Sequence, residues 1–170
     1  MHRLALFDLD GTLADRQSTL SDAVTGLCRV HTLSPAAEQW LRTELFDRAN
    51  AAWSIGAITN GAGDIQRAKL AVTGLAHLVD GVAVLGNLES RKPDLRLFEL
   101  AATRCGVSLA GGGWMTGDNP AGDIGGGHQA GLRTIWLRGR PCPDDLPAAH
   151  HVVDDDVTDA VTILLNETSE

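Results

Sequence analysis

Two aspartates follow a short apolar run near the N-terminus of the chain. The run is LALF (4–7), and Asp8, Asp10, Gly11 and Thr12 come after it. Side chains two positions apart in a strand point to the same face, so the two carboxylates would lie close together if the strand continued that far. Like charges at such a distance repel each other, so a group that compensates their charge must lie nearby.

Further polar side chains stand where other predicted elements end or begin. Thr59 and Asn60 follow SIGAI (54–58), Gly117 and Asp118 follow GGWMT (112–116), Asp123 comes shortly afterwards, and Lys92 precedes a predicted helix. Open parallel sheets bind their ligands beyond the carboxyl ends of the strands. If the sheet is parallel, these groups and the first two aspartates bring four carboxylates, one hydroxyl and one ammonium to one pocket.

This combination of groups is suited to binding a phosphate together with a metal ion. Carboxylate oxygens without sulfur or paired histidines suit a hard cation such as Mg²⁺. The cation would offset the repulsion between the carboxylates, and Lys92 and Thr59 would hold phosphate oxygens that the cation does not bind. One carboxylate is left free to attack phosphorus, as in enzymes that form an aspartyl phosphate.

Apolar runs alternate with helical patterns along the chain, which indicates an α/β fold with a central, mainly parallel sheet. The predicted strands are 4–7, 54–58, 81–85, 112–116 and 132–137, with a further short strand near His150 and His151. The predicted helices are 18–31, 34–53, about 63–75, 94–105, 121–130 and about 156–166. Two successive helices within about 16–50 break the alternation, which indicates an inserted capping element.

Composition and charge narrow the classes of protein that fit this chain. Its 170 residues, 44% of them hydrophobic, fit one domain with a sizeable core. The net charge of −8 argues against binding to a nucleic acid polymer or an acidic membrane, which would need a basic face. Cys28, Cys105 and Cys142 lack metal-type spacing and are expected to be reduced thiols. No stretch has the apolar length of a membrane span, so we expect a soluble, cytoplasmic protein whose oligomeric state is unknown.

Four stretches of the chain, taken in order, resemble the motifs of the haloacid dehalogenase-like (HAD) hydrolase superfamily. They are FDLDGTL with Asp8 and Asp10, ITNG with Thr59, RKPD with Lys92, and GDNPAGD with Asp118 and Asp123. The resemblance extends from residue 4 to about residue 137. It implies a Rossmann-like three-layer fold that forms a single domain over 1–170, with a small helical cap at about 16–50.

The resemblance implies roles for three residues around the expected metal. Asp8 would be the nucleophile and a Mg²⁺ ligand. Asp10 would protonate the leaving oxygen and later activate water, while its backbone carbonyl binds the metal. Asp118 would be a further metal ligand.

Four more residues would serve the phosphoryl group or the charges around it. Thr59 and the Asn60 N–H would bind the transferring phosphoryl group. Lys92 would neutralise charge on that group and on Asp8. Asp123 would support the site, either through a metal-bound water or by holding Lys92.

The activity implied by the resemblance is Mg²⁺-dependent hydrolysis of a phosphate monoester, a small phosphorylated metabolite, through a phospho-Asp8 intermediate. Asp10 favours phosphate chemistry over carbon–halogen cleavage, because a leaving alkoxide needs a proton and a leaving halide does not. Two alternatives stay open: a phosphomutase or phosphotransferase with the same intermediate, and a non-catalytic binding protein on the same fold. The natural substrate is not indicated by the sequence.

Overall fold

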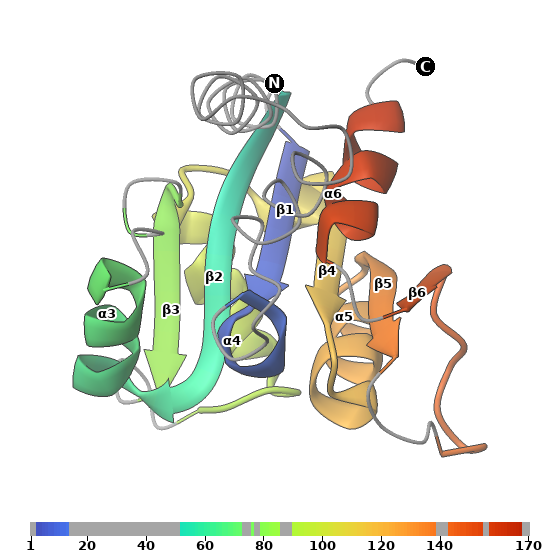
Figure 1. Ribbon diagram of the computed structural model, residues 1–170, viewed down its shortest axis with the longest axis horizontal. Coiled ribbons are helices and arrows are strands. Elements are labelled where there is room, and N and C mark those ends of the chain that lie inside the picture. Colours follow the sequence, from blue (N-terminus) through green and yellow to red (C-terminus); the bar gives the residue numbers. More distant parts are fainter. Residues whose placement is uncertain are drawn as a thin grey trace, which may run out of the picture.

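The computed structural model describes residues 3–13, 52–72, 76, 79–85, 90–138, 143–154 and 157–167 of the chain. Within these residues a sheet with helices on both faces forms the body of the molecule (Figure 1). The predicted cap at about 16–50 lies outside the described residues, as do Cys28 and Cys142. The cap and the single-domain organisation over 1–170 therefore stay predictions.

The sheet contains six strands within the described residues, and every neighbouring pair is parallel. In chain order they are β1 (Arg3–Asp8), β2 (Trp53–Ala62), β3 (Gly81–Leu85), β4 (Gly113–Gly117), β5 (Arg133–Arg138) and β6 (His151–Asp154). Their order across the sheet is β3-β2-β1-β4-β5-β6. The predicted α/β class with its parallel sheet is confirmed, and each predicted strand is present.

The helices that the structure describes follow the predicted positions with small changes at their ends. They are α3 (Gly63–Val72), α4 (Leu95–Arg104), α5 (Gly126–Gln129) and α6 (Val157–Asn166). The helix predicted over 121–130 begins as a wider π-helical turn, Pro120–Gly125, and only its last part is α-helical. At the start of α4, the Asp94 carboxylate accepts a hydrogen bond from the Arg96 N–H (3.0 Å), so the expected acid at this helix start is its N-cap.

The predicted end of the helix over 34–53 is wrong at Trp53. This residue is the first of β2 and pairs with Arg3 of β1. Its indole is buried and donates a hydrogen bond to the Leu164 carbonyl oxygen in α6 (3.2 Å). Burial of a large aromatic ring between the sheet and α6 outweighs the local helical pattern.

Two hydrophobic cores, one on each face of the sheet, make the three layers. Side chains in β1 alternate between them, because successive residues of a strand point to opposite faces. Leu4 and Leu6 belong to the core that includes α4, whereas Ala5 and Phe7 belong to the core that includes α6. In Figure 1, α6 lies in front of the sheet and α4 behind it. The predicted helices on both faces are thus confirmed.

The order of the strands reverses at β1, and this reversal determines where a ligand can bind. β2 and β3 lie on one side of β1, while β4, β5 and β6 lie on the other. Crossover connections then leave β1 and β4 in opposite directions, and the crevice between them is where open α/β sheets bind ligands. Asp8 ends β1 and Asp118 directly follows β4, so both carboxylates lie at this crevice.

The close approach of α5 to the sheet gives a test of how the core is packed. A Cβ atom at Gly127 would lie 2.8 Å from Thr134 Cγ2 and 3.0 Å from Met115 Cβ, whereas one at Gly125 would meet Leu146 Cδ2 at 3.5 Å. We expect Gly127→Ala to lower the free energy of unfolding by about 1–3 kcal/mol through overpacking. Gly125→Ala should not lower it, because alanine favours a helix over glycine by about 1 kcal/mol. Urea denaturation measures both, and equal stabilities of the two variants would contradict this packing.

Candidate active site

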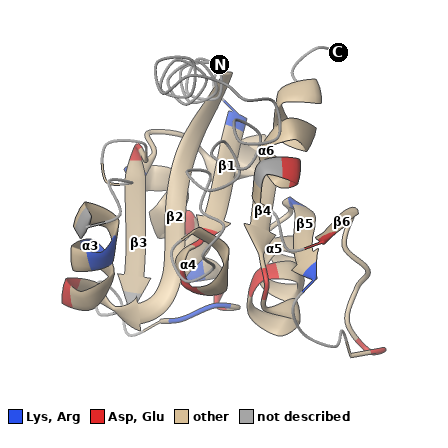
Figure 2. Cartoon of the chain, in the orientation of Figure 1, with Lys and Arg blue, Asp and Glu red and all other residues tan. Residues whose placement is uncertain are grey.

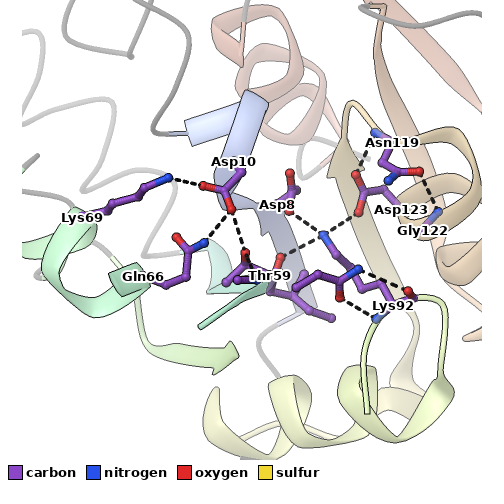
Figure 3. A network of polar contacts seen from close by, with 12 residues as sticks. Asp8, Asp10, Thr59, Gln66, Lys69, Lys92, Asn119, Gly122 and Asp123 are labelled. Atoms are coloured by element: carbon purple, nitrogen blue, oxygen red, sulfur yellow. Dashed lines mark hydrogen bonds and ion pairs between the residues drawn. The ribbon is translucent and has the colours of Figure 1, made fainter. Parts of the chain in front are cut away.

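Lys92 forms ion pairs with two carboxylates near the carboxyl ends of the strands (Figure 3). Its Nζ lies 2.5 Å from Asp8 Oδ1 and 2.6 Å from Asp123 Oδ1, and it donates a hydrogen bond to the Ile58 carbonyl oxygen at 3.1 Å. Lys92 and Asp8 are each 5% exposed, and Asp123 is fully buried. The structure therefore brings together one cation and two acids that stand far apart in the sequence.

The main chain of Lys92 is held in place by the side chain of Asn60. Asn60 Oδ1 accepts a hydrogen bond from the Lys92 N–H (2.7 Å), and Asn60 Nδ2 donates one to the Lys92 carbonyl oxygen (3.3 Å). The sequence predicts a backbone N–H role for Asn60 and does not indicate this use of its side chain. A carboxamide that pairs with both backbone polar groups of one residue holds the loop before α4 against the end of β2.

The Asp123 carboxylate is also held by a hydrogen bond through the oxygen that does not contact Lys92. Its Oδ2 accepts a hydrogen bond from the Asn119 N–H (3.0 Å), and Asn119 Oδ1 accepts one from the Gly122 N–H (3.0 Å). Gly117 leaves the space for this carboxylate, because a Cβ atom there would lie 2.1 Å from Asp123 Oδ2. Of the two roles expected for Asp123, its ion pair with Lys92 matches the one in which it holds that lysine.

Burial and mutual repulsion change the ionisation of this group. Burial raises the pKa of Asp8 to about 7, the negative charge of Asp123 adds to the rise, and Lys92 opposes it. Burial also raises the pKa of Asp123 against the opposing effect of Lys92. Burial lowers the pKa of Lys92, but the charges of Asp123 and Asp8 outweigh it, and the net direction is upward. The lysine thus stays charged, while burial favours the protonated forms of Asp8 and Asp123.

The carboxylates near Lys92 are arranged as a metal site requires. Oxygen atoms of Asp8, Asp118 and Asp123 lie within 4.8 Å of one another, and all three residues are buried. Lys92 offsets part of the repulsion among these carboxylates, and a divalent cation would offset it further. The donor set is made of oxygen alone, which fits Mg²⁺.

Gly11 brings the turn after β1 against this cluster. Its φ is +79°, and a Cβ atom there would lie 2.7 Å from Asp118 Oδ2. Glycine alone meets both conditions without strain. The backbone next to Asp10 therefore lies close to the Asp118 carboxylate, which is compatible with the metal contact expected of the Asp10 backbone carbonyl.

The side chain of Asp10 has different partners from that of Asp8. Its Oδ2 accepts hydrogen bonds from Gln66 Nε2 (2.5 Å) and Thr59 Oγ1 (3.3 Å), and its Oδ1 lies 2.6 Å from Lys69 Nζ. The Thr59 hydroxyl is buried and also accepts a hydrogen bond from the Gly61 N–H (3.2 Å). The two motif aspartates are thus paired with different lysines.

Gln66 and Lys69 both contact Asp10, and neither was predicted from the sequence. Both come from α3, where residues three positions apart share one face. Lys69 is the only lysine of the chain besides Lys92. Its spacing from Gln66 on the helix after the second motif was the available signal, but nothing in the sequence shows which way that face points.

Both lysines of the chain, Lys69 and Lys92, lie at this site. The described basic residues as a whole are spread over the fold, with members in β1, α3, the loop before α4 and β5 (Figure 2). None of the described helices has the length and the apolar character of a membrane span.

Comparison with known proteins gives matches of three kinds. A model of the HAD-hydrolase-like family matches residues 89–161. The phosphoserine phosphatase of Thermus thermophilus is 34% identical over 139 residues, which are 82% of this chain and 54% of that protein. The pyrimidine 5'-nucleotidase YjjG of Escherichia coli is 37% identical over 90 residues, which are 53% of this chain and 39% of that protein. The chain thus spans about half the length, or less, of these curated relatives.

A solved structure shares the fold over nearly its whole length. The HAD phosphatase from Thermococcus onnurineus superposes with a TM-score of 0.68 at 19% sequence identity, over 95% of this chain and 97% of that one. At this level of identity the similarity shows the fold alone.

Proposed function

Because the chain belongs to the HAD-like hydrolase superfamily, we propose that it is a Mg²⁺-dependent phosphatase that hydrolyses a phosphate monoester through an aspartyl phosphate on Asp8. The observation that carries the proposal is the position of the Asp8 carboxylate. It is buried at the end of β1, paired with Lys92, and close to the carboxylates of Asp118 and Asp123, which could hold a metal ion together with it. A buried nucleophile among fixed charges suits phosphoryl transfer, which depends on alignment and charge stabilisation.

Asp8, Asp118 and the Asp10 backbone carbonyl would hold the metal, and the metal would supply positive charge to the phosphoryl oxygens. An Asp8 carboxylate oxygen attacks phosphorus while the bond to the ester oxygen breaks. Asp10 gives its proton to that leaving oxygen, so an alcohol is released. Lys92 and Thr59 hold phosphoryl oxygens, with the Asn60 N–H as a further donor.

The second half of the reaction restores the enzyme. Water attacks phosphorus, Asp10 takes one of its protons, and the bond between phosphorus and Asp8 breaks to release inorganic phosphate. Asp123 supports both halves by holding Lys92 from the side opposite to Asp8. The closeness of Asp8, Lys92 and Asp123, and of Asp10 and Thr59, supports this sequence of steps.

The substrate class that we propose is a small phosphorylated metabolite. The curated relatives are named as a phosphoserine phosphatase and a pyrimidine 5'-nucleotidase, both of which act on small phosphate esters. The net charge of −8 disfavours a nucleic acid polymer as substrate. A cytoplasmic location stays a prediction from the sequence.

Hydrolysis of p-nitrophenyl phosphate by the purified chain tests the proposal. We expect release of p-nitrophenol with Mg²⁺ and loss of that release with EDTA, followed by a panel of cellular phosphate esters to find the preferred substrate. Phosphate that appears on an added alcohol instead of in solution would identify the phosphotransferase alternative. No release from any ester, combined with no binding of beryllofluoride in the presence of Mg²⁺, would favour a non-catalytic binding protein and defeat the proposal.

A further inference from the structure

Asp10 is held by two donors from α3 that no motif of the site accounts for. Figure 3 shows Gln66 and Lys69 reaching from this helix to the Asp10 carboxylate, each toward a different oxygen. The Gln66 contact is 2.5 Å long and the Lys69 contact 2.6 Å. Two donors on adjacent turns of one helix fix the plane of a carboxyl group as well as its position.

The carboxamide of Gln66 is built into the protein interior. Its side chain is 3% exposed, and its Oε1 is buried without a hydrogen-bond partner in the described part of the chain. Gly61 makes room for it, since a Cβ atom at that position would lie 1.7 Å from Gln66 Nε2. An unpaired buried acceptor costs stability. Stability of the fold is therefore a poor reason for a glutamine at this position. The hydrogen bond from its Nε2 to Asp10 is a better one.

The contact between Lys69 and Asp10 is also poorly explained by stability. The side chains are 34% and 38% exposed, so water screens their attraction. Pairs of this kind contribute between 0 and about 1 kcal/mol. The ion pair instead keeps the carboxylates of Asp8 and Asp10 apart, because Lys92 pairs with Asp8 and Lys69 pairs with Asp10.

We propose that Gln66 and Lys69 are positioning residues for Asp10, which keep its carboxyl group at the mouth of the site, apart from the Asp8 carboxylate and on the side of the leaving group. This inference rests on the proposed phosphatase function. Asp10 passes a proton to the leaving oxygen in the first half-reaction and takes one from water in the second. Both transfers need the carboxyl group within hydrogen-bond reach of the reacting oxygen. Misplacement by about 1 Å can cost about a hundredfold in rate.

The test separates positioning of a general acid from a structural role by changing the leaving group. Benzyl phosphate releases an alkoxide that needs a proton, whereas p-nitrophenyl phosphate releases a stable phenolate. We expect Lys69→Met and Gln66→Met each to lower kcat/KM for benzyl phosphate about 10- to 100-fold. For p-nitrophenyl phosphate the loss should stay below about threefold, because that leaving group departs without the acid.

Three further variants sharpen the comparison. Arg67→Met removes a cation from an exposed position of the same helix and should leave both rates unchanged. Lys69→Arg keeps a cation within reach of Asp10 and should restore part of the rate with benzyl phosphate. In an Asp10→Asn background, which itself should slow benzyl phosphate most, Lys69→Met should cause no further loss, because the group it positions has been removed.

The inference would be overturned if Lys69→Met or Gln66→Met lowered kcat/KM equally for the two substrates. It would also be overturned if Lys69→Met lowered kcat/KM for benzyl phosphate as much in the Asp10→Asn background as in the wild type. Failure of the proposed function looks different, since the wild-type chain would then hydrolyse neither ester. In that event crystal structures decide the positioning claim, because they do not depend on turnover. In Gln66→Met/Lys69→Met the Asp10 side chain should leave its place against α3, and an unchanged side chain would refute the inference.

Discussion

Asp8→Asn should abolish hydrolysis of every phosphate ester that the wild-type chain accepts. A carboxamide oxygen is a far weaker nucleophile than a carboxylate, and loss of a nucleophile costs at least about a thousandfold in kcat. The variant should also bind Mg²⁺ more weakly, because one of the clustered carboxylates has lost its charge. Assays with p-nitrophenyl phosphate and titration with Mg²⁺ measure the two effects.

The Asp8→Asn variant is expected to fold, which makes the loss of activity interpretable. Burial raises the pKa of Asp8 to about 7, so the charged form of this side chain destabilises the folded state. Asparagine has nearly the same shape, and its Oδ1 can still accept the hydrogen bond from Lys92. The far-ultraviolet circular dichroism spectrum and cooperative unfolding should therefore be retained.

A matched control and a covalent readout complete this test. Asp144→Asn removes an exposed carboxylate from the segment before β6 and should leave turnover unchanged. Wild-type protein quenched with acid during turnover should carry one phosphoryl group on the peptide that contains Asp8, and the variant should carry none. Retained turnover in Asp8→Asn, or a phosphoryl group on another residue, would remove Asp8 as the nucleophile.

Lys92→Met should lower stability more than any other single change at the site that keeps side-chain volume, and it should lower activity as well. Lys92 is 5% exposed, and its ammonium contacts Asp8 and Asp123. Removing one partner of a buried ion pair leaves uncompensated charge and costs about 3–5 kcal/mol. Loss of a fixed cation from the phosphoryl site should lower kcat by about 10²- to 10³-fold.

The stability cost of Lys92→Met should grow with pH above 7. In the wild type, Asp8 loses its proton near pH 7, partly because Lys92 favours the carboxylate. Without Lys92 the folded variant keeps that proton to higher pH, whereas the unfolded chain has already lost it. A folded state that binds more protons than the unfolded chain loses stability as pH rises, here by up to about 1.4 kcal/mol per pH unit relative to the wild type.

Urea denaturation at about pH 6.5 and about pH 8.5, with EDTA present, measures this difference across the range in which Asp8 titrates. Arg91→Met is the matched control, because it removes the neighbouring cation from an exposed position and should have little effect at either pH. A cost of Lys92→Met that is the same at both pH values would show that Lys92 does not govern the ionisation of Asp8.

Local pattern was sufficient for most of the fold. Alternation of apolar runs with helical spacing placed the strand Gly81–Leu85 at its observed bounds and put Asp94 at the start of α4, because both signals depend on neighbouring residues. The pattern failed at Trp53, which joins β2 through contacts with β1 and α6 that no local window contains.

The sequence by itself determined which of the motif residues meet at the site. Asp8, Thr59 and Asp118 each stand at or near the end of a strand, and parallel strands in one sheet bring their carboxyl ends to one edge. That much follows from the order and spacing of residues, because each group is tied by its own backbone to the strand it follows.

Only the tertiary structure decided how those groups are paired. The assignment of Lys92 to Asp8 and Asp123, and of Gln66 and Lys69 to Asp10, joins residues up to 84 positions apart. These contacts depend on the strand order, on the turn that Gly11 allows, and on the face that α3 presents, none of which is encoded by spacing along the chain. Distances of a few ångströms between charged groups decide their ionisation, and such distances exist only once the sheet and its helices are packed.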